Sequence, residues 1–257
     1  MSKIQKLLDK TPEKALITAY YLRQKEVSRQ LAQSYVDSGW LERIHNGVYK
    51  RKNVELSWYG AVYSLQRQLN LPVHVSGESA LKIHNIFHHV TMDQINEPIF
   101  LEGPPKTQIP HWFERLFLKR VYYRRSSVLP ANIGIDSMMI PDGFKIDVSS
   151  PERALLEVLI QVTDDHRFDD ASNLTDSFRT WNFDLLLELL QSCKSYKAKR
   201  LLMFFGYFHN IEPLMHLADQ IDLGKGKIQV VTRGKYNAKY QITVPHSYVK
   251  DSEENPF

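Results

Sequence analysis

Residues 38–52 read SGWLERIHNGVYKRK, and this stretch decides the fold of the N-terminal part of the chain. Apolar and polar residues alternate roughly along it, and the Asn46-Gly47 pair is typical of a tight two-residue turn. Two apolar residues return directly after that pair, so the stretch predicts a β-hairpin. Three consecutive cations close it, which gives the hairpin a positive charge.

The residues before the hairpin predict helices. The triplet Thr11-Pro12-Glu13 combines a cap, a proline at the first helical position and an acid in the first turn, so it predicts a helix start. Ser28 can cap the next helix, which is expected to run to about Ser38, where Gly39 ends it. Three helices and a hairpin in residues 1–56 have the order of a winged helix-turn-helix.

The helix after Ser28 has two chemically different faces. Leu31, Tyr35 and Val36 share one face and are expected to pack against Leu16, Ala19 and Tyr20. The opposite face and the wing carry side chains that suit base edges and phosphates. An ordinary solvated surface is the alternative, and the element order favours DNA binding over it. The predicted DNA contacts are Ser28, Arg29, Gln30, Gln33, Ser34, Arg43, His45, Asn46, Lys50, Arg51 and Lys52.

The rest of the chain predicts a second, larger domain over residues 57–257, and a division into lobes 57–150 and 151–257 is left open. Ser150 followed by Pro151 is a clear helix start, and the pattern becomes mostly helical from Asn182 onward. The predicted fold class is therefore α+β, with a winged helix, a mixed α/β domain and a mostly helical C-terminal part. Strands are expected at 72–77, 97–103, 115–125, 143–148, 227–231 and 239–244.

Composition indicates a soluble, cytoplasmic protein. Hydrophobic residues make up 43% of the chain and charged residues 24%, no apolar run is long enough to span a bilayer, and the N-terminus is too polar for a signal peptide. The single cysteine, Cys193, cannot form an internal disulfide. We therefore expect no membrane association.

Charge is distributed unevenly along the chain. Residues 1–60 hold 11 Lys and Arg against 6 Asp and Glu, residues 61–193 hold 12 against 17, and residues 194–257 hold 10 against 6. Such a division predicts two partners or two surfaces of opposite electrostatic preference. A solvated face is an equally good interpretation of the last segment. The predicted second basic surface consists of Lys197, Lys199, Arg200, Lys225, Lys227, Arg233 and Lys235.

Catalytic and metal-binding patterns are incomplete. Asp147 and Glu152 could form a nuclease-like carboxylate pair, but the carboxylate-x-lysine triplet that usually accompanies such a pair is missing. His84 and His88 have helical spacing for zinc, yet no Glu follows His84 and no cysteine is near. The sequence therefore predicts neither an enzyme nor a metal or cofactor site.

Five stretches spread over nearly the whole chain together resemble the AbiEi-type antitoxins of type IV toxin–antitoxin (abortive infection) systems. No single stretch is a specific motif, but their order and spacing match the family. The stretches are YVDSGWLERIHNGVYKRK (35–52), LQRQLNLPVHVSGESALKIHNIFHH (65–89), SSPERALLEVL (149–159), CKSYKAKRLLMFF (193–205) and DLGKGKIQVVTRGKYNAKYQITVP (222–245).

This resemblance implies a protein with two roles in phage defence. Its winged helix would bind inverted repeats in the promoter of its own operon as a transcriptional repressor. Its larger domain would counteract a cognate nucleotidyltransferase-like toxin from the same operon, directly or indirectly, without a cofactor. Two alternatives stay open: a winged-helix regulator with a ligand-sensing domain, and a DNA-targeted nuclease.

Overall fold

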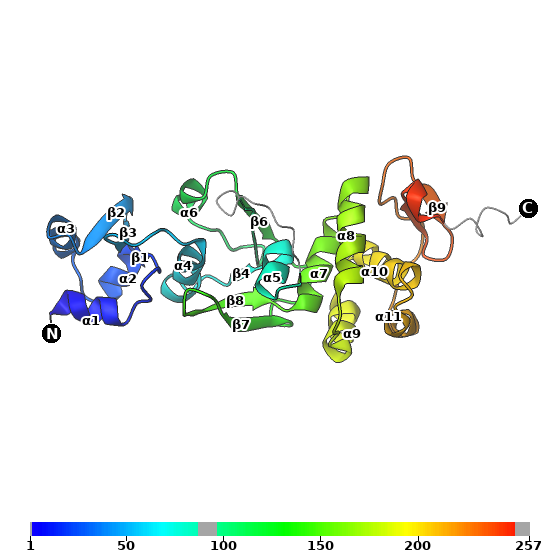
Figure 1. Cartoon of the computed structure of the whole chain (residues 1–257), viewed down its shortest axis with the longest axis horizontal. Coiled ribbons are helices and arrows are strands. Elements are labelled where there is room, and N and C mark those ends of the chain that lie inside the picture. Colours follow the sequence, from blue (N-terminus) through cyan, green and yellow to red (C-terminus); the bar gives the residue numbers. More distant parts are fainter. Residues whose placement is uncertain (1, 87–96, 250–257) are drawn as a thin grey trace, which may run out of the picture. The chain divides into compact units, whose positions relative to one another are not determined.

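The computed structural model describes residues 2–86 and 97–249 and confirms the predicted α+β fold (Figure 1). The chain forms two compact units, each assembled from separate stretches. The predicted boundary at residue 56 falls inside unit 1 and remains a prediction, as does the division near residue 150. Unit 1 contains Met1–Val75, Thr91–Ser126 and Asp136–Val148, and unit 2 contains Ser76–Val90, Ser127–Ile135 and Ser149–Phe257.

Unit 1 begins with the elements of a winged helix-turn-helix. Three short strands form an antiparallel sheet in the order β1-β3-β2, in which Ile17 lies opposite Tyr49. The predicted helix after Ser28 and the predicted hairpin are confirmed. The elements are α1 (Lys3–Asp9), β1 (Ile17–Thr18), α2 (Ala19–Gln24), α3 (Arg29–Asp37), β2 (Leu41–His45) and β3 (Val48–Arg51).

The predicted helix start at Thr11 is wrong. The Thr11 hydroxyl donates to the Leu7 carbonyl at 2.8 Å and so completes the end of α1. The β-branched pair Ile17–Thr18 forms β1, because it finds a partner in β3. Helix α2 starts directly after this pair, and the Thr18 hydroxyl accepts from the Tyr21 N–H at 3.2 Å as its cap.

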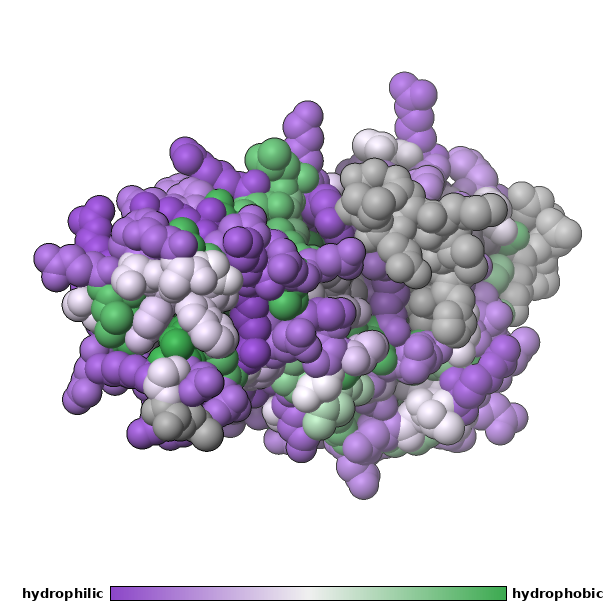
Figure 2. Space-filling view, turned by 60° about the vertical axis from the view of Figure 1, so that its left-hand side comes forward, coloured by the Kyte–Doolittle hydropathy of each residue, from purple (hydrophilic) through white to green (hydrophobic). Residues whose placement is uncertain are grey.

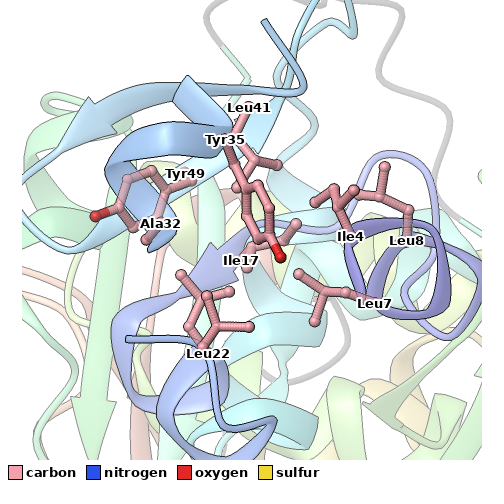
Figure 3. Close-up of a cluster of buried hydrophobic side chains, with 10 residues drawn as sticks. Ile4, Leu7, Leu8, Ile17, Leu22, Ala32, Tyr35, Leu41 and Tyr49 are labelled. Atoms are coloured by element: carbon pink, nitrogen blue, oxygen red, sulfur yellow. The ribbon is translucent and has the colours of Figure 1, made fainter. Parts of the chain in front are cut away.

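Apolar residues from the three helices and the sheet form one core. Figure 3 shows Ile4 and Leu7 of α1, Leu22 of α2 and Tyr35 of α3 gathered in it. Tyr35 is thus buried as predicted, whereas Tyr20, one of its expected partners, is 44% exposed. The buried members of this cluster are Ile4, Leu7, Leu8, Ile17, Leu22, Val27, Ala32, Tyr35, Leu41 and Tyr49.

Two side chains of η1 (Ser64–Gln68), which continues α4 (Trp58–Tyr63), hold the backbone around β1. The Gln68 amide donates to the Leu16 carbonyl at 2.5 Å and accepts from the Thr18 N–H at 2.9 Å. The Ser64 hydroxyl also donates to the Leu16 carbonyl, at 2.8 Å. All these groups are buried, so the side chains satisfy backbone groups that water cannot reach.

A close backbone approach reinforces this junction. A Cβ on Gly60 would lie 1.9 Å from the Lys14 carbonyl oxygen, so the residue at this position of α4 must be glycine. The Lys14 ammonium forms an ion pair with Asp142 at 2.7 Å, and the Ser57 hydroxyl donates to the same carboxylate at 2.5 Å. The winged helix is therefore packed directly on the following part of unit 1.

A five-stranded mixed sheet follows, in the order β6-β5-β4-β8-β7. Strand β5 pairs antiparallel with β4 and parallel with β6, and β4 pairs parallel with β8. The strand predicted at 115–125 is shorter than expected, because its first residues belong to α6 (His111–Leu116). The strands are β4 (His74–Val75), β5 (Ile99–Gly103), β6 (Val121–Arg125), β7 (Ile135–Met139) and β8 (Lys145–Ser149).

Unit 2 is mostly helical, and α7 packs with α5, α8, α9 and α10. Ser150 caps α7 as predicted, with its hydroxyl accepting from the Arg153 N–H at 3.3 Å. Inside the unit, Arg153 pairs with Glu157 at 2.8 Å and also donates to the carbonyls of Pro130 and Ile133. The helices are α5 (Gly77–Ile83), α7 (Pro151–Ile160), α8 (Asp165–Ser177), α9 (Phe183–Ser192), α10 (Tyr196–Phe208) and α11 (Glu212–Leu217), followed by the 3-10 turns η3 (Ala218–Gln220) and η4 (His246–Tyr248).

The predicted strand at 227–231 is wrong. Within it, Ile228 forms an isolated bridge with Ile242, while the Val230 and Val231 N–H groups donate to the Thr243 hydroxyl at 2.8 and 3.2 Å. A side chain thus replaces the backbone partner that a strand needs. The strand pair of this region is β9 (Lys235–Asn237) with β10 (Ile242–Val244), and the second of these was predicted.

Replacing Gln68 by alanine is expected to lower the free energy of unfolding by about 1–3 kcal/mol, because it leaves the Leu16 carbonyl and the Thr18 N–H with fewer partners. Urea denaturation of the full chain measures the change. Gln24→Ala, at an exposed position of α2, is the matched control. Equal midpoints for the two variants would contradict a stabilising role for the junction.

Candidate DNA-binding surface

Helix α3 presents its polar face to solvent because its apolar face is buried. Ser28 caps the helix through a 3.1 Å hydrogen bond from the Leu31 N–H, and Ala32 and Tyr35 lie in the core. The predicted contact residues on the other face, Arg29, Gln30, Gln33 and Ser34, are all exposed. The Gln33 side chain also donates to the Asp37 carboxylate one turn later, at 2.8 Å.

The wing is docked on the start of α2. The Ala19 N–H donates to the Gly47 carbonyl at 2.7 Å, and a Cβ on Gly47, whose φ is +70°, would lie 3.2 Å from the Ala19 side chain. Glycine at the turn therefore permits both its backbone conformation and this contact. Arg43 lies over Tyr49, with the guanidinium 5.6 Å from the ring centroid and 3.3 Å from the hydroxyl.

Helix α3 and the wing line a hollow of about 490 Å³, which we call the reading hollow. It is lined by Arg29, Gln30 and Gln33 of α3 and by Arg43 of β2. These residues are four of the predicted DNA contacts, and they lie on two elements that are separate in the sequence. Their donors and acceptors suit base edges and phosphates.

Some of the remaining wing residues are exposed, and others form hydrogen bonds or ion pairs within the protein. Asn46 and Lys52 are exposed, and His45 is half-buried, with its ring near the Asn46 carbonyl at 3.4 Å. Lys50 pairs with Glu42 at 3.0 Å and donates to the Val54 carbonyl at 2.9 Å. Arg51 donates to the carbonyls of Leu8 and Thr11, each at 2.5 Å, and thereby ties β3 to the end of α1.

Hydrophilic residues cover most of the face seen when the N-terminal part is brought forward, and hydrophobic residues form small patches there (Figure 2). A polar face of this kind suits a polar ligand better than an apolar partner.

Two members of the predicted second basic surface lie in the interior. Lys199 is 3% exposed and donates to the Asp222 carbonyl at 3.2 Å. Arg200 is 1% exposed and donates to the carbonyls of Leu223 and Gly226. These cations hold the 222–226 loop and are not part of a surface. Of the others, Lys197 and Lys235 are half-buried, and Lys225, Lys227 and Arg233 are exposed.

The candidate nuclease carboxylates each have a partner of their own. Asp147 accepts two hydrogen bonds from Arg67, at 3.0 and 2.5 Å, and Glu152 accepts from the Asn182 N–H at 2.8 Å. The His84 ring lies 2.9 Å from the Ser149 carbonyl, and His88 lies outside the described residues. Over residues 2–86 and 97–249, no three His, Cys, Asp or Glu side chains gather as metal ligands do.

Unit 2 holds a triad-like arrangement that the sequence did not suggest. The Ser172 hydroxyl lies 2.8 Å from the His209 ring, whose other nitrogen is 3.5 Å from the Asp176 carboxylate. Ser172 is 1% exposed, so no substrate reaches its oxygen, and the group packs within the fold. Burial also raises the pKa of the Cys193 thiol, which disfavours the reactive thiolate.

The sequence matches two family models that together cover nearly the whole chain. Residues 96–245 match "Transcriptional regulator, AbiEi antitoxin, Type IV TA system", and residues 1–92 match "Transcriptional regulator, AbiEi antitoxin N-terminal domain". The chain belongs to the AbiEi antitoxin family. This confirms the resemblance that the sequence stretches indicated.

A solved structure resembles the fold of this chain. The crystal structure of RV2827C protein from Mycobacterium tuberculosis aligns with a TM-score of 0.63 at 14% identity, over 94% of this chain and 89% of that chain. At this identity the match shows the fold alone. The curated proteins compared with the sequence include no match. No helix in the described part of the chain is long and apolar enough to cross a bilayer.

Replacing Arg51 by alanine is expected to lower the free energy of unfolding by about 1–3 kcal/mol, because two backbone carbonyls of the α1 end lose a charged donor. Thermal and urea denaturation measure it. Lys52→Ala removes the neighbouring exposed cation and is expected to change stability by less than about 0.5 kcal/mol. A stable Arg51→Ala protein would contradict this structural role.

Proposed function

We propose that this AbiEi antitoxin represses its own operon by binding inverted repeats in double-stranded promoter DNA. The observation that carries the proposal is the convergence of Arg29, Gln30, Gln33 and Arg43 on the reading hollow. Family membership supports it, because the family consists of transcriptional regulators. A helix-turn-helix places its second helix, which is α3 here, in the major groove, where base edges are distinguishable.

The side chains around the reading hollow can bind different groups of the DNA. A glutamine can bond adenine through its amide, and an arginine can bond guanine or a phosphate through its planar fork. The hydrogen bond to Asp37 engages the Gln33 amino group and leaves its carbonyl oxygen to accept from a base. Asn46 and Lys52 of the wing would contact the backbone or the minor groove, as would His45. One winged helix covers a half-site, so an inverted repeat takes two copies.

In this proposal, several of the predicted DNA contacts stabilise the fold. Ser28 caps α3, Lys50 pairs with Glu42, and Arg51 holds the end of α1. The Ser34 carbonyl accepts from the Ser38 hydroxyl, while the Ser34 side chain is exposed and available to a phosphate. DNA recognition therefore rests mainly on the α3 face and on Arg43.

The antitoxin role is proposed from family membership, which names type IV toxin–antitoxin systems. Residues outside the winged helix would counteract a nucleotidyltransferase-like toxin from the same operon, by direct contact or indirectly. The internal partners of Asp147 and Glu152 count against the nuclease alternative.

The ligand-sensing alternative has one observation in its favour. A hollow of about 930 Å³ in unit 1 lies between Tyr20 of α2 and residues of α6 and β6, among them His111, Tyr123 and Arg125. Its volume is in the range of small-molecule sites. A compound that shifts operator affinity and loses its effect in Tyr123→Ala would support this second function.

Replacing Gln30 and Gln33 by alanine should relax sequence preference, with each change costing on the order of 1–3 kcal/mol on the preferred site. Fluorescence anisotropy of the full chain with its own upstream DNA and a scrambled duplex measures this. Gln24→Ala is the control. Unchanged preference in the double variant would mean that another face reads the DNA, and equal binding of both duplexes by the wild type would overturn the proposal.

Charge reversal tests whether the exposed C-terminal cations touch DNA. Lys225→Glu with Lys227→Glu should make the dependence of log affinity on log salt shallower by about two if both contact phosphates. The control reverses Arg179 and Lys194, which are also exposed cations of unit 2. A slope equal to that of the control would remove this surface from the DNA interface.

A further inference from the structure

A second, smaller hollow of about 300 Å³ lies on the winged helix, between α2, the start of α3 and the wing. Its floor is apolar and buried, with Leu22, Ala32 and Tyr49 each no more than 3% exposed. In Figure 3, Ala32 and Tyr49 lie side by side above Leu22. The hollow is therefore built on the same core that fixes α3.

Three arginines from three different elements line this hollow. Arg23 comes from α2, Arg29 from α3 and Arg43 from β2, and all three are exposed. No acidic residue lines the hollow. Among the residues that the structure describes, no carboxylate forms an ion pair with any of these arginines. Placing like charges close together raises the electrostatic free energy unless an anion binds among them.

The shape and chemistry of the hollow favour a phosphate group. Guanidinium forks bind phosphate oxygens in pairs, and the first N–H groups of α3 add positive potential from the same side. The apolar floor suits the sugar carbons on either side of a phosphodiester. Arg29 and Arg43 line both this hollow and the reading hollow, so an anion here would lie next to the side chains that face bases.

We propose that Arg23, Arg29 and Arg43 form an arginine seat that holds one backbone phosphodiester of the bound DNA and fixes the register of α3. This inference rests on the proposed DNA-binding function. It adds Arg23, which lies on α2 and outside the predicted contact set. A phosphate held at a fixed place beside the reading hollow determines which base pairs Gln30 and Gln33 can reach.

The test compares Arg23→Ala with Lys25→Ala in the full chain. Both remove one exposed cation near the end of α2, but Lys25 lies over the Tyr21 ring, 5.3 Å from its centroid, and does not line the seat. Anisotropy across a salt series with the upstream DNA is the readout. Arg23→Ala should weaken binding about tenfold and make the salt slope shallower by about one, while Lys25→Ala leaves the slope unchanged.

A chemical probe locates the phosphate. Single phosphates of the duplex are replaced in turn by neutral methylphosphonates, and wild type and Arg23→Ala are compared on each. One position per half-site should weaken the wild type and leave the variant unaffected, because the two changes remove the same contact. Arg23→Lys should recover most of the salt slope and little of the affinity. Circular dichroism and melting curves confirm that the variants fold.

The outcomes separate this inference from the function on which it rests. Sequence-dependent binding by the wild type, with Arg23→Ala equal to Lys25→Ala, overturns the seat and leaves the DNA-binding function standing. Equal binding of upstream and scrambled DNA by the wild type overturns the DNA-binding function itself, and the inference falls with it. In a third outcome, inorganic phosphate stabilises the wild type against heat but not Arg23→Ala, and this variant binds DNA normally. That result would assign the seat to a free anion and overturn the contact with the DNA backbone.

Discussion

The hydrogen bonds from Gln68 and Ser64 to the backbone around β1 are the constraint on which the N-terminal half depends. Strand β1 has two residues, and one edge of it pairs with β3 of the wing. On the other side, the Leu16 carbonyl and the Thr18 N–H bond to the side chains of η1. The wing is thus connected through β1 to the part of unit 1 that carries the five-stranded sheet. The winged helix is an integrated part of this unit.

The sequence predicted the elements that local chemistry determines. The Asn46-Gly47 turn, the Ser28 cap and the Ser150-Pro151 start all appear as predicted, because each is encoded within a few neighbouring residues. Prediction from the sequence failed where a group far away in the chain determines the local structure. Ile17–Thr18 becomes a strand because β3 pairs with it, and Val230 and Val231 do not, because Thr243 occupies their N–H groups.

The candidate site shows the same division. Periodicity along α3 correctly placed Arg29, Gln30 and Gln33 on the exposed side, since burial of Tyr35 fixes the opposite face. Counting charges did not reveal which cations have backbone partners. Arg51 and Arg200 each serve two or more carbonyls that sequence reasoning could not locate. Some cations of this chain thus hold loops through backbone carbonyls and do not contribute to a charged surface.

The contact between Ala19 and Gly47 bears on the thermodynamics of recognition. The turn of the wing is bonded to the start of α2, and α3 packs into the same core, so the structure holds α3 and the wing at a defined spacing. Little conformational entropy remains to be lost when a ligand arrives. In the proposed complex, the DNA would therefore adapt its groove width to the protein. Stiff and flexible base steps would be distinguished at positions that no side chain touches.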